Sequence, residues 1–158
     1  MTLRRTTSDD LQRLQAIRDE PEVSRWWGIL EPGELEEFIA EETSLAIEVD
    51  GDVIGAIQYA EEDDPMYRHA GIDIYLTTER HGQGYGAEAV RLLARYLIGE
   101  RGHHRLTIDP AATNTAAIAA YAKVGFRPVG VLRQYERGPD GTWHDGLLME
   151  LIADELVD

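Results

Sequence analysis

The first part of the chain alternates between short apolar runs and helical apolar stripes. Leu3 to Thr6 has the pattern of a short strand, and Ser8 offers an N-cap for an amphipathic helix after it. Glu20-Pro21 is expected to end this helix, because the residue before a proline avoids the helical conformation. After a short connecting segment, a second helix is predicted beyond Pro32-Gly33. The apolar faces of the two helices are formed by Leu11, Leu14 and Ile17, and by Leu35, Phe38 and Ile39.

The middle of the chain is typical of strands. Leu45 to Val49 and Val53 to Tyr59 flank an Asp50-Gly51 step, which is a strong signal for a hairpin turn. An acidic loop at 61–65 separates them from a further strand at Ala70 to Leu76.

The second half of the chain returns to helices and ends in a hairpin. Gly84 to Ile98 carries a helical apolar stripe, and Leu106 to Asp109 is a short strand stopped by Pro110. Asn114 is placed to cap a helix that runs to Val124 and closes at Gly125. The last two strands, Val129 to Tyr135 and Trp143 to Ile152, are joined by a turn at 138–141. The predicted order is β-α-α-β-β-β-α-β-α-β-β, an α/β fold in which residues 1–158 form one domain around one sheet.

The net charge of the chain limits the classes of partner that it can bind. Its 158 residues carry a formal net charge of −15, and Lys123 is the sole lysine among 15 basic residues. Such a surface repels nucleic-acid phosphates and attracts polycations. The alternative is that the acidic surface only keeps the protein soluble. No apolar run is long enough to cross a membrane and no signal sequence is recognisable, so we expect a cytoplasmic protein without a membrane partner.

The chemistry open to the chain is limited by its composition. It contains no cysteine, which excludes disulfides, thiolate ligands and an acyl-cysteine intermediate. Its 5 histidines form no helical His-x-x-x-His pair, so we expect no metal.

Two motifs suggest an anionic ligand. The first, His81-Gly82-Gln83-Gly84-Tyr85-Gly86, lies between a predicted strand and a predicted helix, where glycines and free N–H groups suit a pyrophosphate. It matches neither a Walker A loop nor a Rossmann fingerprint, and a plain glycine turn is the alternative. The second places Asn114, Ala117 and Tyr121 on one helical face before Gly125-Phe126. The small Ala117 would let a ligand lie close to that helix.

Together the two motifs resemble the GNAT acetyltransferase superfamily. The first is similar to its pyrophosphate loop, although His81 stands where that loop has Gln or Arg, and the second is similar to its coenzyme helix. The closest resemblance is to aminoglycoside 6′-N-acetyltransferases. It is carried by Val23-x-x-Trp26-Trp27-Gly28, Gly71-Ile72-Asp73 and the segment from Asp109-Pro110 to Gly125-Phe126.

The resemblance implies acetyl-CoA as co-substrate and direct transfer of its acetyl group to a primary amine. Asp73 would orient and deprotonate the amine, and Tyr121 would protonate the leaving thiolate. A backbone N–H at Tyr75 or Leu76 would bind the oxyanion. The residues expected to contact the coenzyme are Tyr75, Leu76, His81, Gly82, Gln83, Gly84, Tyr85, Gly86, Asn114, Ala117 and Tyr121. Those expected to contact the acceptor are Trp26, Trp27, Asp73, Asp109 and Asp145, with Asp140 a weaker candidate.

Each assignment has a structural alternative. Asp73 can be a hydrogen-bonded strand residue, Tyr121 a packing residue, Asp109 a turn cap and the Trp pair part of the core. Other functions also stay open: acylation of a siderophore hydroxylysine, N-acetylation of peptides, or binding of acetyl-CoA or a drug without turnover. The oligomeric state, monomer or homodimer, is not fixed by the sequence.

Overall fold

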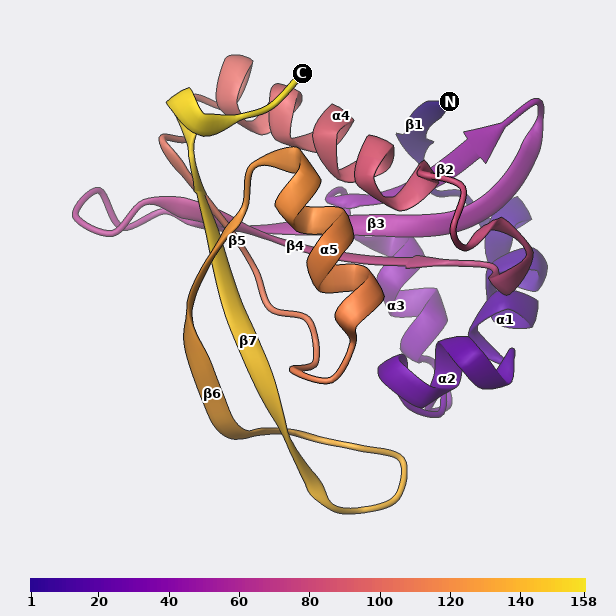
Figure 1. Ribbon diagram of the computed structural model, residues 1–158. Helices are drawn as coiled ribbons and strands as arrows, with labels where there is room; N and C mark the ends of the chain where they lie inside the picture. The colour runs from indigo at the N-terminus through magenta and orange to yellow at the C-terminus, as the bar shows by residue number, and fades with distance from the viewer.

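One seven-stranded sheet organises the protein, and a computed structural model describes it over residues 1–158 (Figure 1). The strand order is β1-β2-β3-β4-β5-β7-β6, and only the β4–β5 pair is parallel. The strands are β1 (Thr2–Arg5), β2 (Ser44–Val49), β3 (Asp52–Glu62), β4 (His69–Leu76), β5 (Arg105–Ile108), β6 (Arg127–Arg137) and β7 (Trp143–Ile152).

Helices cover both faces of the sheet. The helices are α1 (Leu11–Arg18), α2 (Pro21–Trp27), α3 (Glu34–Ala40), α4 (Tyr85–Gly99) and α5 (Thr115–Val124). Under α4 and α5 lies an apolar cluster of 20 buried residues, which includes Ile57, Leu93 and Leu106. A smaller cluster of 6 residues, here called the α1–α3 cluster, packs on the other face and includes Leu14, Leu35 and Tyr75. The predicted α/β fold around one sheet is confirmed, with helices on both faces of the sheet. No helix is long and apolar enough to span a bilayer.

The helix α2 is absent from the sequence prediction. Pro21 was expected only to end the preceding helix, but it also occupies the first turn of α2. Proline suits that position because its fixed φ is helical and the N–H it lacks would have no partner there. As a result, Trp26 and Trp27 lie on a helix and not in a connecting segment.

The parallel pair β4–β5 separates after three residue pairs. Its register joins Ala70 to Leu106, Gly71 to Thr107 and Ile72 to Ile108. Beyond this point β5 ends, and the chain leaves through Pro110 toward α5 while β4 continues to Leu76. The two strands therefore open a gap in the sheet, and the next residue on each side of it is an aspartate, Asp73 and Asp109.

Candidate active site

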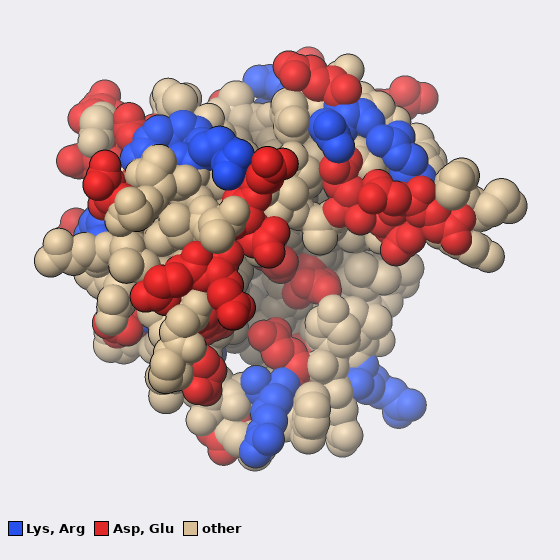
Figure 2. Space-filling model, turned by 180° about the vertical axis from the view of Figure 1, so that it is seen from behind, with Lys and Arg blue, Asp and Glu red and all other residues tan.

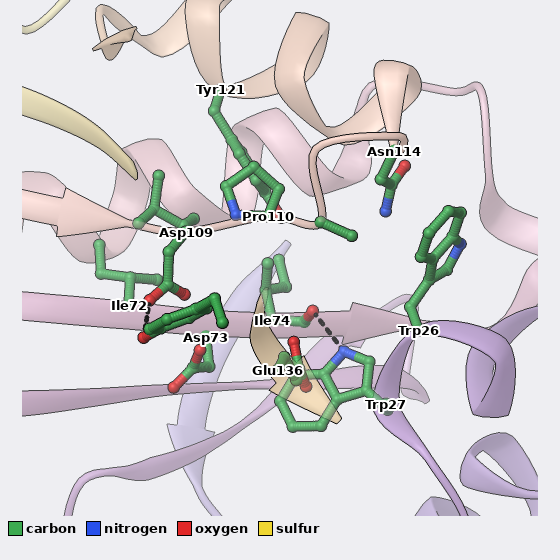
Figure 3. A pocket seen from close by; sticks show the side chains of 13 residues that line it. Trp26, Trp27, Ile72, Asp73, Ile74, Asp109, Pro110, Asn114, Tyr121 and Glu136 are labelled. Atoms are coloured by element: carbon green, nitrogen blue, oxygen red, sulfur yellow. Dashed lines mark hydrogen bonds between the residues drawn. The ribbon is translucent and has the colours of Figure 1, made fainter. Parts of the chain in front are cut away.

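A pocket of about 540 Å³ opens where β4 and β5 part. Three carboxyl groups line it: Asp73 on β4, Asp109 at the end of β5, and Glu136 on β6 (Figure 3). The remaining lining residues are Trp26, Trp27, Ile72, Ile74, Ile108, Pro110, Ala111, Asn114, Tyr121 and Tyr135. No lysine or arginine is among them, so the pocket is strongly negative. From behind, acidic side chains gather around a hollow in the middle of the surface (Figure 2).

Asp73 is the most perturbed carboxyl group of the pocket. The surrounding protein withdraws part of its hydration, and the negative charges of Asp109 and Glu136 add to this effect, so the pKa of Asp73 rises from 3.8 to about 6. The side chain nevertheless stays open to water in the pocket. A carboxylate with a pKa near neutrality that water can reach is suited to proton transfer.

Asp109 is held by a tyrosine that the sequence reasoning missed. The Tyr135 hydroxyl donates a hydrogen bond of 2.7 Å to a carboxylate oxygen of Asp109. This hydrogen bond is the main reason that the pKa of Tyr135 rises to about 12. The carboxylate of Asp109 therefore faces the pocket, and the alternative that it caps the turn before Pro110 has no hydrogen bond to support it.

Tyr135 and Glu136 reach the pocket because of an irregularity in the terminal hairpin. The pairing of β6 with β7 shifts between Leu132 and Glu136, where four residue steps on β6 face two on β7. Within this bulge Gln134 has a φ of 49°, and its N–H donates to Asp145 at 2.8 Å. A bulge interrupts the regular alternation of side chains along a strand. A strand pattern alone therefore could not predict that Tyr135 and Glu136 face the pocket.

Asp145, which was predicted to contact the acceptor, supports this bulge. It does not line the main pocket but a neighbouring one of about 380 Å³, which shares Trp26, Ala111 and Glu136 with it. Asp140 also lines the second pocket, where its carboxylate accepts hydrogen bonds from Thr142 and contacts His144.

The helix α5 contributes Tyr121 and Asn114 to the main pocket. Tyr121 is buried apart from its pocket side, and burial together with the charges of Asp73 and Asp109 raises its pKa. The phenol is therefore neutral and holds its proton at any ordinary pH. Asn114 caps α5 through its side-chain oxygen, which accepts from the Ala117 N–H at 3.2 Å, and its amide NH₂ remains for a ligand.

The two tryptophans have different roles. The Trp27 indole N–H donates to the Ile74 carbonyl at 3.2 Å, and its ring meets Tyr75 edge-to-face at 4.9 Å. Trp27 is therefore fixed as a wall of the pocket. Trp26 lines both pockets, and its ring lies 4.6 Å from the guanidinium carbon of Arg25. It is the tryptophan that is placed to stack on a ligand.

Beyond Ile72, β4 has an open edge. The Thr77 N–H bonds to Ile54 of β3, and in an antiparallel pair every second residue directs its backbone groups to the partner strand. Tyr75 therefore faces β3, while Ile74 and Leu76 face the gap. Of the two predicted oxyanion donors, only Leu76 lies on this edge, and Ile74 is the second N–H there. The side chain of Tyr75 lies in the α1–α3 cluster, and the β3–β4 register shows no bulge.

The predicted glycine loop leads from β4 into α4. Gly82 and Gly84 have φ values of 73° and 86°, which non-glycine residues rarely adopt. A Cβ at either position would meet no atom within 4 Å, so the loop surface is open. None of the backbone N–H groups of residues 82–87 donates to a backbone carbonyl. The loop thus presents free donors at the N-terminal end of α4, as an anion site requires.

Two side chains of the loop are directed inward. The His81 ring lies 2.9 Å from the Leu76 carbonyl, and the Gln83 amide donates to the Glu79 carbonyl at 2.8 Å. Both side chains stabilise the loop itself, which leaves ligand contact to the backbone of Gly82 to Gly86. The Tyr85 ring lies 5.7 Å from the guanidinium carbon of Arg80.

A sheet that splays beside a glycine loop and a capped helix defines a class of acyl-transferring proteins. The chain matches the family described as acetyltransferase (GNAT) domain over residues 1–127. It therefore belongs to the GNAT family and is an N-acetyltransferase, as the sequence predicted.

Individual relatives show which members it is similar to. An aminoglycoside N(6′)-acetyltransferase type 1 from Klebsiella pneumoniae is 29% identical over 164 aligned positions, covering 89% of this chain and 79% of that protein. Among solved structures, AAC(6′)-Ib in complex with paromomycin and acetyl-CoA has a TM-score of 0.78 at 25% identity, covering 98% of this chain and 94% of that one. A ribosomal-protein-alanine N-acetyltransferase from Brucella melitensis has a TM-score of 0.79 at 25% identity, covering 96% and 99%.

Proposed function

We propose that this protein transfers the acetyl group of acetyl-CoA to a primary amine of a small polycationic acceptor, of which an aminoglycoside is the best example. The observation that carries the proposal is the pocket with three carboxyl groups and no basic residue at the parting of β4 and β5. The similarity to aminoglycoside acetyltransferases supports the same acceptor class.

The free N–H groups of residues 82–87 fit the pyrophosphate of acetyl-CoA. Asn114 lines the pocket, and Ala117 follows it in the first turn of α5, where its small side chain would let the coenzyme lie close. Acetyl-CoA supplies an acetyl group activated as a thioester. In our proposal the N–H groups of Ile74 and Leu76 on the open edge of β4 donate to the thioester oxygen, where negative charge develops.

The carboxyl groups divide the work on the acceptor. An alkylammonium with a pKa of about 10.4 is almost fully protonated at pH 7, and freeing its lone pair costs roughly 4 kcal/mol. In our proposal Asp73 takes this proton, directly or through water, because its pKa of about 6 leaves it ionised but basic at neutral pH. Asp109 and Glu136 hold other ammonium groups of the acceptor, which stay charged. Tyr121 gives its proton to the thiolate that leaves, and it regains a proton, through water, from the attacking nitrogen, which loses its second proton as the amide forms.

Acceptors with one amine fit this pocket less well. A single ammonium next to three carboxylates is bound but is also stabilised in its unreactive, protonated form. An acceptor with several amines anchors through some of them and reacts through another. Peptide acetylation is the second candidate function, because the ribosomal-protein-alanine N-acetyltransferase shares the fold over nearly the whole chain.

The proposal is tested by measuring release of free CoA at pH 7.5 with four acceptor classes: aminoglycosides, linear polyamines, hydroxylysine and peptides with a free N-terminus. We expect the highest kcat/KM with aminoglycosides, falling as salt rises because ammonium–carboxylate attraction is screened. The Asp63→Asn variant, which removes one exposed charge that does not line the pocket, should behave as wild type. A preference for peptides, or no turnover of any amine, would refute the proposal.

A further inference from the structure

Arg18, at the end of α1, is a buried cation with poor partners. Its side chain is only 4% exposed and lies beside the α1–α3 cluster. Its Nη2 reaches the carbonyls of Trp27 and Gly28 at 3.3 and 3.4 Å, and a Glu34 oxygen lies at 3.9 Å. Its Nε has no hydrogen-bond partner. A buried guanidinium so loosely paired contributes little to stability compared with an apolar side chain, so packing alone does not account for it.

Arg18 contacts two aromatic rings, one of which lines the pocket. Its guanidinium carbon lies 5.2 Å from the centre of the Trp27 ring and 5.7 Å from that of Tyr75, within the range of cation–π attraction. The same charge lies at the C-terminal end of α2, where the helix carbonyls favour a cation. Trp27 itself lines the pocket, whereas Arg18 does not, and the indole N–H reaches Ile74 on the open edge of β4 (Figure 3).

We propose that Arg18 is a positioning residue for acetyl transfer. It holds the Trp27 ring across the open edge of β4 and thereby fixes one wall of the acceptor pocket. This inference rests on the proposed function, because it assigns the wall to the acceptor and not to acetyl-CoA.

The position of Trp27 depends mainly on the contacts of its side chain. It is the last residue of a helix of 7 residues, and Gly28, which follows with a φ of 80°, leads into a segment that exposes Ile29. Without the Arg18 charge, the indole keeps one hydrogen bond of 3.2 Å, one aromatic contact and its packing against the α1–α3 cluster. It loses the cation that lies over its ring, so we expect the ring to move more freely and the acceptor to meet a less defined surface.

The functional test separates positioning from folding. In Arg18→Met we expect a Tm within about 3 °C of wild type, because a weakly paired buried charge is replaced by an apolar chain. The KM for the best acceptor should rise about tenfold, while the KM for acetyl-CoA stays unchanged. Arg18→Lys, which keeps the charge, should raise the acceptor KM less. Arg13→Met, on the exposed side of α1, is the matched control and should leave both constants unchanged.

The link through Trp27 is tested by a double-mutant cycle. Trp27→Phe removes the N–H to Ile74 and should raise the acceptor KM by a similar factor, and the double variant should show little further loss. Fully additive effects, or an Arg18→Met variant that raises both KM values equally, would overturn the inference. Trp27→Phe also serves if the Arg18 variants do not fold.

A further measurement needs no turnover. In a Trp26→Phe/Trp143→Phe background, Trp27 is the sole tryptophan, and Arg18→Met should increase quenching of its fluorescence by acrylamide at least twofold. Unchanged quenching would refute the role of Arg18. If quenching increases but the protein acetylates no amine, the role of Arg18 in holding Trp27 stands and the proposed function is refuted.

Discussion

Replacing Asp73 by asparagine is expected to stabilise the protein while it impairs turnover. The side chain keeps its shape in this variant, but the carboxylate that Asp109 and Glu136 repel is gone. The rise of the Asp73 pKa from 3.8 to about 6 corresponds to about 3 kcal/mol at full effect. Because Asp73 is open to water in the pocket, solvent screening reduces this, and we expect the free energy of unfolding to increase by about 1 kcal/mol at pH 8.

The pH dependence of this gain has a definite sign. A carboxyl group whose pKa is raised in the folded state binds protons more tightly there, so it destabilises the protein increasingly as the pH rises from about 4 to about 6. The difference between Asp73→Asn and wild type should therefore be near zero at pH 4 and complete above pH 7. In wild type, kcat/KM should rise with pH through about 6, as the base becomes ionised.

The assay is urea unfolding of both proteins at several pH values, combined with acetyl transfer at pH 7.5. Turnover of the variant should fall by about 10²-fold, the usual contribution of a general base. The control is Asp63→Asn, which removes the same charge from an exposed loop. A less stable Asp73→Asn variant at pH 8 would refute the electrostatic reasoning, and wild-type turnover would refute the role of Asp73 as base.

Further variants test the other parts of the site. Tyr121→Phe should lower kcat by about 10²-fold, because the proton donated to the thiolate is lost, while acetyl-CoA affinity measured by calorimetry changes little. An unchanged kcat would show that Tyr121 is not the acid. Gly84→Ala places a side chain at a φ of 86°, so acetyl-CoA affinity should fall about tenfold and the free energy of unfolding by about 1 kcal/mol. An unchanged affinity would show that the loop does not bind the coenzyme. Glu136→Gln should raise the KM of a polycationic acceptor severalfold at low salt and less at high salt, and steady-state kinetics that show no salt dependence would exclude Glu136 from the acceptor site.

Local chemistry explains what was predictable about the site. The glycine loop was recognisable because its φ values of 73° and 86° are ones that residues other than glycine rarely adopt. Asn114 was recognisable because capping needs an oxygen at that position. Asp73 could be assigned to the opposite strand face from Ile72, because side chains alternate along a strand. Each of these signals is contained within a few neighbouring residues.

Features that depend on distant contacts could not be predicted in this way. Tyr135 and Glu136 enter the pocket through a bulge, and its position is set by pairing with β7. The division of roles between Trp26 and Trp27 depends on Ile74, 47 residues away from Trp27 in the chain. The open edge of β4 likewise exists only because β5 ends after three pairs.

The sequence by itself thus determined the order of the elements apart from α2, the GNAT membership and the residues whose chemistry is local. Only the tertiary structure decided which side chains share the pocket and how their charges alter one another. The physical reason is that periodicity, capping and turn conformation are set over a few residues. The pKa of Asp73, in contrast, depends on its burial and on the charges of Asp109 and Glu136, which are distant in the chain and come within range only when the sheet has formed.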